Sequence, residues 1–109
     1  MGNCVVFVTA PKGKEPHSLA KMLLEKKLCA CVNIVKEIDS FFWWQGKIDT
    51  AKESLLVIKT RRSLLAALTR AVKQAHSYEV CEVIALPIIG GNKDYLDWVS
   101  ASCKKGNKR

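Results

Sequence analysis

The segment from residue 29 to residue 60 constrains the fold of this chain more than any other. It has two arms rich in β-branched and aromatic residues, neither of which contains proline, separated by Gln45-Gly46-Lys47. This pattern predicts two long antiparallel strands joined by a tight turn. Strands usually run about 5–6 residues, so arms of this length reach beyond one small domain. The edges and apolar faces of such a hairpin need a cover, and we expect copies of the same chain to provide it.

The segments before the hairpin predict a strand and a helix. Residues 4–9 form a continuous apolar run, which indicates a central strand covered on both faces. Proline and glycine in residues 10–14 break this run. An apolar face formed by Leu19, Met22 and Leu23 then predicts a helix over about residues 15–27.

The segments after the hairpin predict a second helix, a strand and a terminal helix. Ser63 is a suitable N-cap for an apolar helical stripe that runs to His76. Residues 80–89 form a strand whose centre, 83–86, has a buried character, and Gly90-Gly91 ends it. Asn92 caps a short last helix that carries an apolar side. That side is formed by Tyr95, Trp98 and Val99.

This order of elements defines the expected fold class. It is an α+β arrangement, the ferredoxin-like βαββαβ order with a long hairpin between the second and third strands and a C-terminal helix. Right-handed crossovers place both main helices on one face of the antiparallel sheet. The opposite face also needs a cover, which again favours self-association.

Chain length and charge predict one domain and a basic tail. With 109 residues, the chain suffices for one domain, which we place at residues 1–103. The net charge is +8, and without the four basic residues of segment 104–109 it is 14 − 10 = +4. We expect this tail to be disordered. Such a tail can bind phosphate non-specifically, but solubility is its commoner role, and we expect no specific nucleic-acid partner.

Cysteine content and hydropathy predict a cytoplasmic protein. The chain has five cysteines, an odd number, and no cleavable signal sequence is recognisable after Met1. No apolar run approaches the roughly 20 residues of a membrane span. We therefore expect reduced thiols and no membrane association.

Eight short motifs identify a family resemblance, and they occur in family order across residues 3–103. They are VFVTAP (6–11), LEKKL (24–28), ACVN (30–33), WWQGKI (43–48), IKT (58–60), HSYEV (76–80), IALP (84–87) and DYLDW (94–98). The chain resembles the CutA family of divalent-cation tolerance proteins. The resemblance implies a ferredoxin-like subunit in a tight homotrimer, links to copper and other divalent metals, and no established catalytic reaction. It also implies an alternative, a PII-like signalling or structural trimer, which rests on fold analogy.

The sequence departs from the usual family pattern at two positions, and it lacks two of three copper ligands proposed for some bacterial members. Ser77 and Cys81 replace prolines that the family usually has, and both changes restore a backbone N–H and loosen φ. We therefore expect the loop that follows His76 to be more mobile than is typical. Some bacterial members have three proposed copper ligands, and Val8 and Ala75 occupy two of those positions here. Only His76 remains, so that copper site cannot be transferred directly.

Five residues are candidate metal ligands: His76, Glu79, Cys31, Cys81 and Glu82. Imidazole, thiolate and carboxylate groups bind zinc or copper, and four of the five lie within seven residues of one another. The alternative for His76 is a capping role at the end of a helix, with solvated glutamates. Cys29 and Cys31 are two apart in a predicted strand, so their thiols would share a face; the alternative is that both are core residues. We expect copper or divalent-metal binding near His76, micromolar or weaker.

The aromatic residues 41–44 predict either a trimer core or a ligand surface. Alternation sends Trp43 and Trp44 to opposite faces, so at most one of them would line a given surface. Trp44 and Tyr78, with Lys59 of the IKT motif, are candidates for an inter-subunit cleft that takes a small ligand.

Two other protein classes with this order of elements are disfavoured. An RNA-recognition motif needs aromatic residues on its third strand, and residues 53–58 contain none. An acylphosphatase-like enzyme needs an arginine after its first strand, where this chain offers Lys12 and Lys14, which lack the bidentate fork. We therefore expect a non-enzymatic protein.

Overall fold

The computed structural model describes residues 2–105 and contains one four-stranded antiparallel sheet with helices. The strands are β1 (Asn3–Pro11), β2 (Cys31–Trp44), β3 (Lys47–Arg61) and β4 (Val83–Pro87), in the spatial order β2-β3-β1-β4. The helices are α1 (Glu15–Glu25), α2 (Leu65–Ala75) and α3 (Lys93–Ser102), with a short 3-10 helix, η1 (Arg62–Leu64), before α2. The predicted α+β class and the order of the main elements are confirmed.

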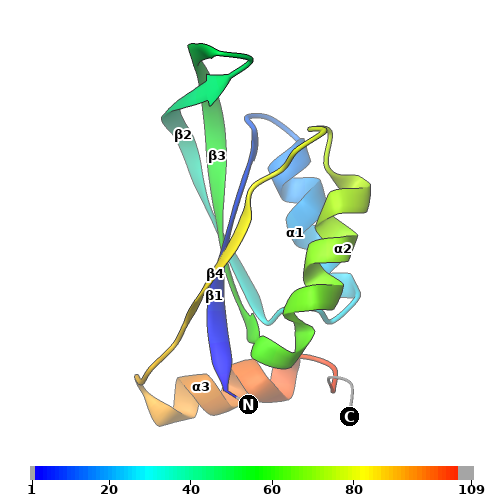
Figure 1. Cartoon of the computed structure of the whole chain (residues 1–109). Helices are drawn as coiled ribbons and strands as arrows, with labels where there is room; N and C mark the ends of the chain where they lie inside the picture. Colours follow the sequence, from blue (N-terminus) through cyan, green and yellow to red (C-terminus); the bar gives the residue numbers. More distant parts are fainter. Residues whose placement is uncertain (1, 106–109) are drawn as a thin grey trace.

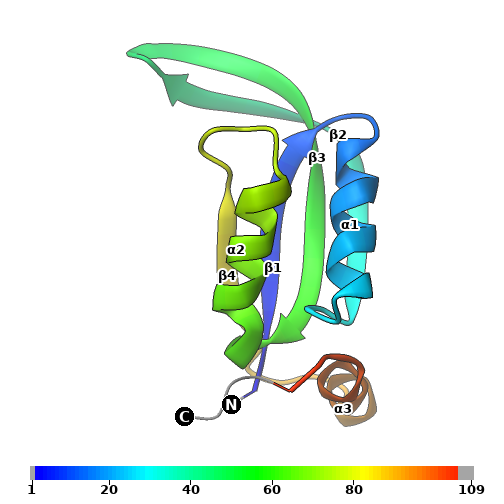
Figure 2. The same cartoon turned by 90° about the vertical axis from the view of Figure 1, so that its right-hand side faces the viewer.

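The core lies between one face of the sheet and the two main helices. Figure 2 shows α1 and α2 side by side over that face. Because side chains alternate along a strand, every second residue of β1 and β3 points to the helices. Val6, Val8, Leu56 and Ile58 are fully buried there, and they pack in the same cluster as leucines such as Leu23.

The other face of the sheet is largely uncovered in the single chain. Figure 1 shows α1 and α2 on one side of the strands, while α3 lies only across their lower end. We call this surface the open face. Residues paired across neighbouring strands share a face, so register places Val5, Phe7, Leu55, Val57, Ile84 and Leu86 on it.

The open face corrects two expectations. β1 is central, but the chain covers it fully on one side only. Residues 83–86 do not form a buried centre, because Ile84 is 55% exposed and Leu86 is 54% exposed. The reason is that β4 alternates like the other strands, and within the described residues no element packs over the outward side chains of these two residues.

The β2-β3 hairpin is as long as its sequence predicts. Its two-residue loop, Gln45 and Gly46, has positive φ at both positions, 50° and 78°, which is the backbone that a type I′ turn requires. One extra residue between Val35 and Ile38 forms a β-bulge, with Glu37 at φ 57°, and bulges bend a strand. The hairpin extends the molecule to 43 × 26 × 25 Å and its radius of gyration to 14.4 Å, against about 13 Å for a compact domain of this length.

Three local predictions about element ends have mixed outcomes. The Ser63 N-cap is wrong, since Ser63 lies inside η1 and α2 follows Leu64 without a side-chain cap. The predicted strand 80–89 shortens to β4, because residues 76–82 form a separate loop. The Asn92 cap is confirmed: its side-chain oxygen accepts from the amide of Asp94 at 3.0 Å.

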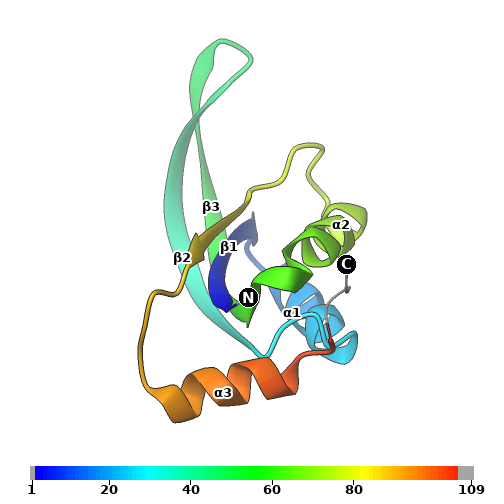
Figure 3. The same cartoon turned by 60° about the horizontal axis from the view of Figure 1, so that its bottom comes forward.

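Helix α3 closes the end of the sheet where the chain begins (Figure 3). The side chain of Asn3 donates to the carbonyl of Leu96 at 3.0 Å and accepts from the hydroxyl of Ser100 at 3.1 Å. The amide of Lys104 donates to the carbonyl of Lys27 at 2.9 Å. Of the predicted tail, residues 106–109 lie outside the described residues. In the part of the chain that the structure covers, every helix is too short or too polar to cross a membrane.

A buried hydroxyl in β3 yields a stability prediction. Thr60 is fully buried, and its Oγ1 donates to the carbonyl of Leu28 at 2.6 Å. Thr60→Val keeps the shape of the side chain but removes this donor from a buried carbonyl, so we expect a loss of about 2 kcal/mol in the free energy of unfolding. Urea denaturation at a fixed chain concentration measures it.

The matched control is Thr69→Val in α2. The Thr69 hydroxyl donates to the carbonyl of Leu65, four residues earlier, at 2.8 Å. That carbonyl keeps its helical amide donor, so we expect a change below about 0.5 kcal/mol. Equal denaturation midpoints for Thr60→Val and the unchanged chain would contradict this role of Thr60.

Candidate functional site

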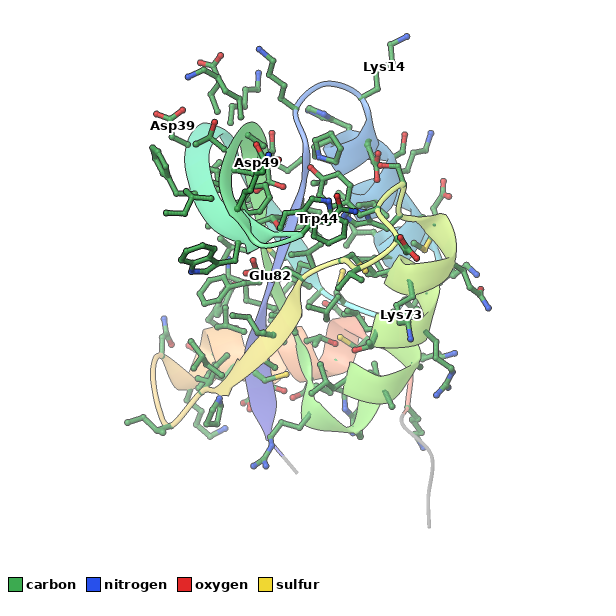
Figure 4. All side chains as sticks on the ribbon, turned by 45° about the horizontal axis from the view of Figure 1, so that its top comes forward. Lys14, Asp39, Trp44, Asp49, Lys73 and Glu82 are labelled. Carbon is green, nitrogen blue, oxygen red and sulfur yellow. The ribbon has the colours of Figure 1, made fainter. Side chains whose placement is uncertain are left out.

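A pocket of about 660 Å³ lies between the far end of the hairpin and the loop of residues 76–82. We call it the hairpin pocket. Its lining is Thr9, Ser40, Phe41, Phe42, Trp43, Trp44, Asp49, Glu53, Tyr78, Glu79, Val80 and Glu82. Figure 4 shows Asp49 and Trp44 of the hairpin and Glu82 of the loop on the same side of the molecule, apart from Lys14 and Lys73. The pocket thus depends on two segments that are far apart in the sequence.

Aromatic residues of β2 form one wall of the hairpin pocket. Both Trp43 and Trp44 belong to the lining, so the expectation that no single surface includes both is wrong. A two-stranded ribbon twists more than a wide sheet does, and at the end of this ribbon strict alternation no longer separates neighbouring residues. Trp44 is the more enclosed of the two, 44% exposed against 73% for Trp43.

A buried carboxylate lies at the base of the hairpin pocket. Glu53 is only 6% exposed, and its Oε2 accepts a hydrogen bond from the Tyr78 hydroxyl at 2.8 Å. Burial, the hydrogen bond to Glu53, and the negative charges of Glu53 and Glu15 raise the pKa of Tyr78 to about 12. The phenol therefore stays protonated and acts as a donor to Glu53 at physiological pH.

His76 anchors the loop of residues 76–82 through both ring nitrogens. A carbonyl only accepts, so Nε2 donates to the oxygen of Thr9 at 2.7 Å, while Nδ1 accepts from the amide of Tyr78 at 3.0 Å. The ring also contacts that of Tyr78, with centroids 4.8 Å apart. Glu15 supports the same turn, because its Oε2 accepts from the amide of Ser77 at 2.8 Å and lies 3.4 Å from Nδ1. The histidine thus holds Tyr78 in place.

The candidate metal ligands are spread over three places. Glu79 and Glu82 line the hairpin pocket. Cys81 is half-buried and packs against the core, and His76 is buried with both nitrogens hydrogen-bonded. Cys31 lies at the start of β2, opposite Lys59 of β3. Within residues 2–105, no group of three or more His, Cys, Asp or Glu side chains converges closely enough to hold a metal ion.

The two neighbouring cysteines do not share a face, which corrects that expectation. Cys29 precedes β2, so strand alternation does not apply to it, and it is buried in the core. Cys31 is half-buried on β2, and its Sγ lies 3.8 Å from Oδ1 of Asn33. Burial raises the pKa of Cys29 to about 12, which disfavours the thiolate that metals bind.

The candidate ligand-cleft residues are only partly brought together. Trp44 and Tyr78 both line the hairpin pocket, but Lys59 does not, and its amine bonds to the side chain of Asn33 instead. Sequence reasoning missed Asp49 and Glu53. One sequence pattern points to Glu53. It alternates with Leu55 and Val57 in the predicted strand, so an acidic side chain shares a face with apolar ones.

The Tyr78–Glu53 hydrogen bond predicts a pH-dependent contribution to stability. Tyr78→Phe leaves a buried carboxylate without its donor, so we expect a loss of about 1.5 kcal/mol at pH 7. The pKa of Tyr78 is higher in the folded chain than the unfolded value of about 10. The stabilisation is therefore complete below about pH 10 and is lost as pH rises toward 12. Urea denaturation of both chains at about pH 7, 9 and 11 measures the difference.

The control for this prediction is Tyr95→Phe, because Tyr95 is the one other tyrosine of the sequence. Tyr95 lies in α3, outside the hairpin pocket, and is 41% exposed. Burial raises its pKa as well, so the control applies to the loss at about pH 7, which should be smaller than in Tyr78→Phe because no buried carboxylate loses a donor. A stability difference between Tyr78→Phe and the unchanged chain that stays constant from about pH 9 to 11 would show that the phenol proton does not contribute.

Known proteins resemble this chain over nearly its whole length. Residues 4–102 match the family described as CutA1 divalent ion tolerance protein. The chain is 54% identical to rice "Protein CutA 1, chloroplastic" over 101 residues, which cover 93% of this chain and 57% of that protein. It is 48% identical to the "Divalent-cation tolerance protein CutA" of Archaeoglobus fulgidus, over 86% of this chain and 91% of that protein. The chain thus spans little more than half of its plant relative.

Solved structures show the same fold. The crystal structure of CutA1 from Oryza sativa is 51% identical, with a TM-score of 0.95 over 97% of both chains. The CutA1 structure from Thermus thermophilus is 40% identical, with a TM-score of 0.91 over 94% of this chain and 99% of that one. The fold, the eight motifs and the sequence identities agree, and the chain belongs to the CutA1 divalent ion tolerance protein family.

Proposed function

We propose that this chain acts as a homotrimeric, non-enzymatic divalent-cation tolerance protein that binds copper or a related divalent metal ion. The observation that supports metal binding is the charge of the hairpin pocket. Asp49, Glu53, Glu79 and Glu82 line it, and no lysine or arginine of the described residues does. The chain as a whole is strongly basic, with 18 basic and 10 acidic residues, so this local acidity favours cations.

The carboxylates of the loop are the ligands in this proposal. Glu79 and Glu82 are exposed and can turn toward an ion, whereas His76 would first have to give up its hydrogen bonds to Thr9 and Tyr78. Two carboxylates with water make a weak site for a divalent ion, and copper binds better to imidazole and thiolate. We therefore expect affinities that are micromolar or weaker.

The proposed homotrimer rests on the open face and on the hairpin. A soluble chain rarely leaves a large apolar patch exposed, and the open face together with the extended hairpin presents one. The ferredoxin-like subunit implied by the family resemblance fits such an assembly. That the chain catalyses no reaction is likewise inferred from the resemblance and from the absence of a catalytic motif in the sequence.

The proposed compartment is the cytoplasm. All five cysteines are unpaired in the structure, which fits a reducing compartment. Relatives carry other printed locations: the rice protein is named chloroplastic, and one archaeal structure is described as periplasmic.

A second candidate function is binding of a small ligand, in signalling or in a structural trimer. Trp44 and Tyr78, two of the three predicted cleft residues, both line the hairpin pocket. Thr9 and Glu53 also line it, and strand register places Thr9 on the same side of the sheet as Phe7. The pocket therefore borders the open face, where a neighbouring subunit of the proposed trimer would lie.

The metal proposal predicts which substitutions weaken metal binding. Calorimetric titration of the unchanged chain with Cu²⁺ should give a dissociation constant in the micromolar range or above. The double change Glu79→Gln, Glu82→Gln should weaken binding about tenfold, because it removes the charge of both ligands. His76→Ala should act less strongly.

The control is Glu25→Gln, an exposed glutamate of α1 outside the hairpin pocket, which should leave the affinity unchanged. A loss in His76→Ala larger than that in the double variant would move the metal site back to His76. Equal affinity in all variants would place copper outside the hairpin pocket.

The trimer proposal predicts a charge-sensitive assembly. Ile84→Asp puts a charge on the open face at a residue that is more than half exposed in the single chain, so the subunit should fold but assemble poorly. Sedimentation at micromolar concentration should show a trimer for the unchanged chain and lighter species for the variant. Leu24→Asp, at a 42% exposed position of α1, should remain trimeric. A folded monomer of the unchanged chain would contradict the proposal.

A further inference from the structure

We propose that the hairpin pocket binds an organic ammonium ion, a primary amine on an apolar stem. This inference names the ligand class of the small-ligand function and rests on that second candidate function. It does not depend on metal binding. Three features support it: a buried carboxylate with one oxygen unused, aromatic walls, and the absence of basic side chains from the lining described above.

The first feature is Glu53. It is more than nine-tenths buried, and Oε2 is bonded to the Tyr78 hydroxyl. No hydrogen bond or ion pair within residues 2–105 involves its Oε1, and no fully buried side-chain oxygen there lacks a partner. Oε1 is therefore not fully enclosed, and Glu53 belongs to the lining of the pocket. A buried carboxylate without a cation is costly, and an ammonium N–H placed there would donate to it and neutralise it.

The second feature is the aromatic wall of residues 41–44. Trp44 and Tyr78 both line the hairpin pocket, Trp44 from the hairpin and Tyr78 from the loop of residues 76–82. Indole and phenol faces attract cations and at the same time pack against apolar groups. A bare metal ion uses only the carboxylates, whereas an amine with an apolar stem uses both kinds of side chain.

The third feature is how the charges are distributed. Four of the ten acidic residues of the chain line this one pocket. Two lysines of the hairpin lie nearby in the sequence but do not line the pocket. Lys52 bonds to Asp39 at 2.8 Å, and Lys47, which pairs with Trp44, is exposed. The local field thus favours a cation and opposes an anion such as a nucleotide phosphate.

The position of Glu53 favours a primary amine over a quaternary one. Oε1 is a hydrogen-bond acceptor, and a primary ammonium has three N–H donors while a quaternary ammonium has none. The Tyr78 hydroxyl, which donates to Oε2, fixes the orientation of the carboxylate. His76 in turn holds the amide of Tyr78. The acceptor is therefore already oriented before a ligand arrives.

The test compares three probes with nearly the same apolar body and different charge. The probes are 2-phenylethylamine, the neutral 2-phenylethanol and the anionic 3-phenylpropionate, titrated calorimetrically into the full chain at neutral pH and low salt. We expect the amine to bind about tenfold more tightly than the alcohol, since it adds a charge-assisted hydrogen bond and a cation–π contact. The propionate should bind more weakly than either.

Two substitutions and one matched control locate the binding. Glu53→Gln keeps an acceptor for Tyr78 but removes the charge, and Trp44→Leu removes the aromatic face; each should weaken amine binding about fivefold or more. Trp98→Leu, at a 48% exposed position of α3 against 44% for Trp44, should bind the amine as the unchanged chain does. If Glu53→Gln fails to fold, as judged by circular dichroism, Glu82→Gln replaces it.

The outcomes separate this inference from the functions proposed above. Equal binding of the amine and the alcohol, lost in Trp44→Leu, would overturn the inference and leave a pocket for an uncharged ligand. Preference for the propionate would overturn it as well. Absence of binding by all three probes would overturn both it and the small-ligand function, while copper binding that depends on Glu79 and Glu82 would leave the metal function intact. A loss in Trp98→Leu equal to that in Trp44→Leu would place the amine elsewhere.

Discussion

The pairing of β2 with β3 along nearly their whole length is the constraint on which the rest of the structure depends. Along residues 53–61, β3 also pairs with β1, and the helices cover one side of the sheet. In the rest of the hairpin, the two strands have no further partner within the described residues and form a free ribbon. The bulge at residues 35–38 lies near the point where β1 stops pairing with β3 and the two-stranded ribbon begins. Because bulges bend and twist a strand, it sets where the aromatic residues at the tip can lie.

The hairpin pocket is thus formed by a rigid strand and by a loop whose position depends on side-chain hydrogen bonds. The rigid strand is β3, whose Glu53 stands at the junction of sheet and ribbon, paired with Pro11 on one side and Ile38 on the other. The loop is that of residues 76–82, which has no ladder hydrogen bonds of its own. Its fixation depends on His76 and on Tyr78, which bond to β1 and β3 respectively. A pocket of this kind keeps its polar groups oriented, but the buried carboxylate lowers the stability of the fold. Features that lower stability in this way are common where proteins bind ligands.

Much of this architecture can be predicted from the sequence. The predictions that are wrong fail for physical reasons that the structure identifies. Strand and helix positions follow from apolar periodicity, and the tight turn follows from Gly46 between two β-branched and aromatic arms. The exposure of Ile84 and Leu86 does not follow from the sequence, because an apolar strand has a similar composition whether one or both of its faces are covered within the chain. The role of Glu53 is also hidden, since its partner Tyr78 is 25 residues away and the contact depends on how the loop folds back. The sequence singles out His76 as a ligand, but the structure engages it in hydrogen bonds that the sequence does not reveal.

Ser77 and Cys81 show how the loop is held without the prolines that the family usually has there. A proline stiffens a loop by fixing φ but cannot donate a hydrogen bond. Ser77 lacks that stiffness, yet its amide donates to Glu15 of α1, so the restored N–H is used to tie the loop to the helix layer. Cys81 packs its side chain against the core instead. The expected gain in mobility is therefore opposed at both positions by a contact that proline would not make in the same way. Because Tyr78 lies between them, these two contacts help to keep its hydroxyl within reach of Glu53, and the geometry of the hairpin pocket depends on them.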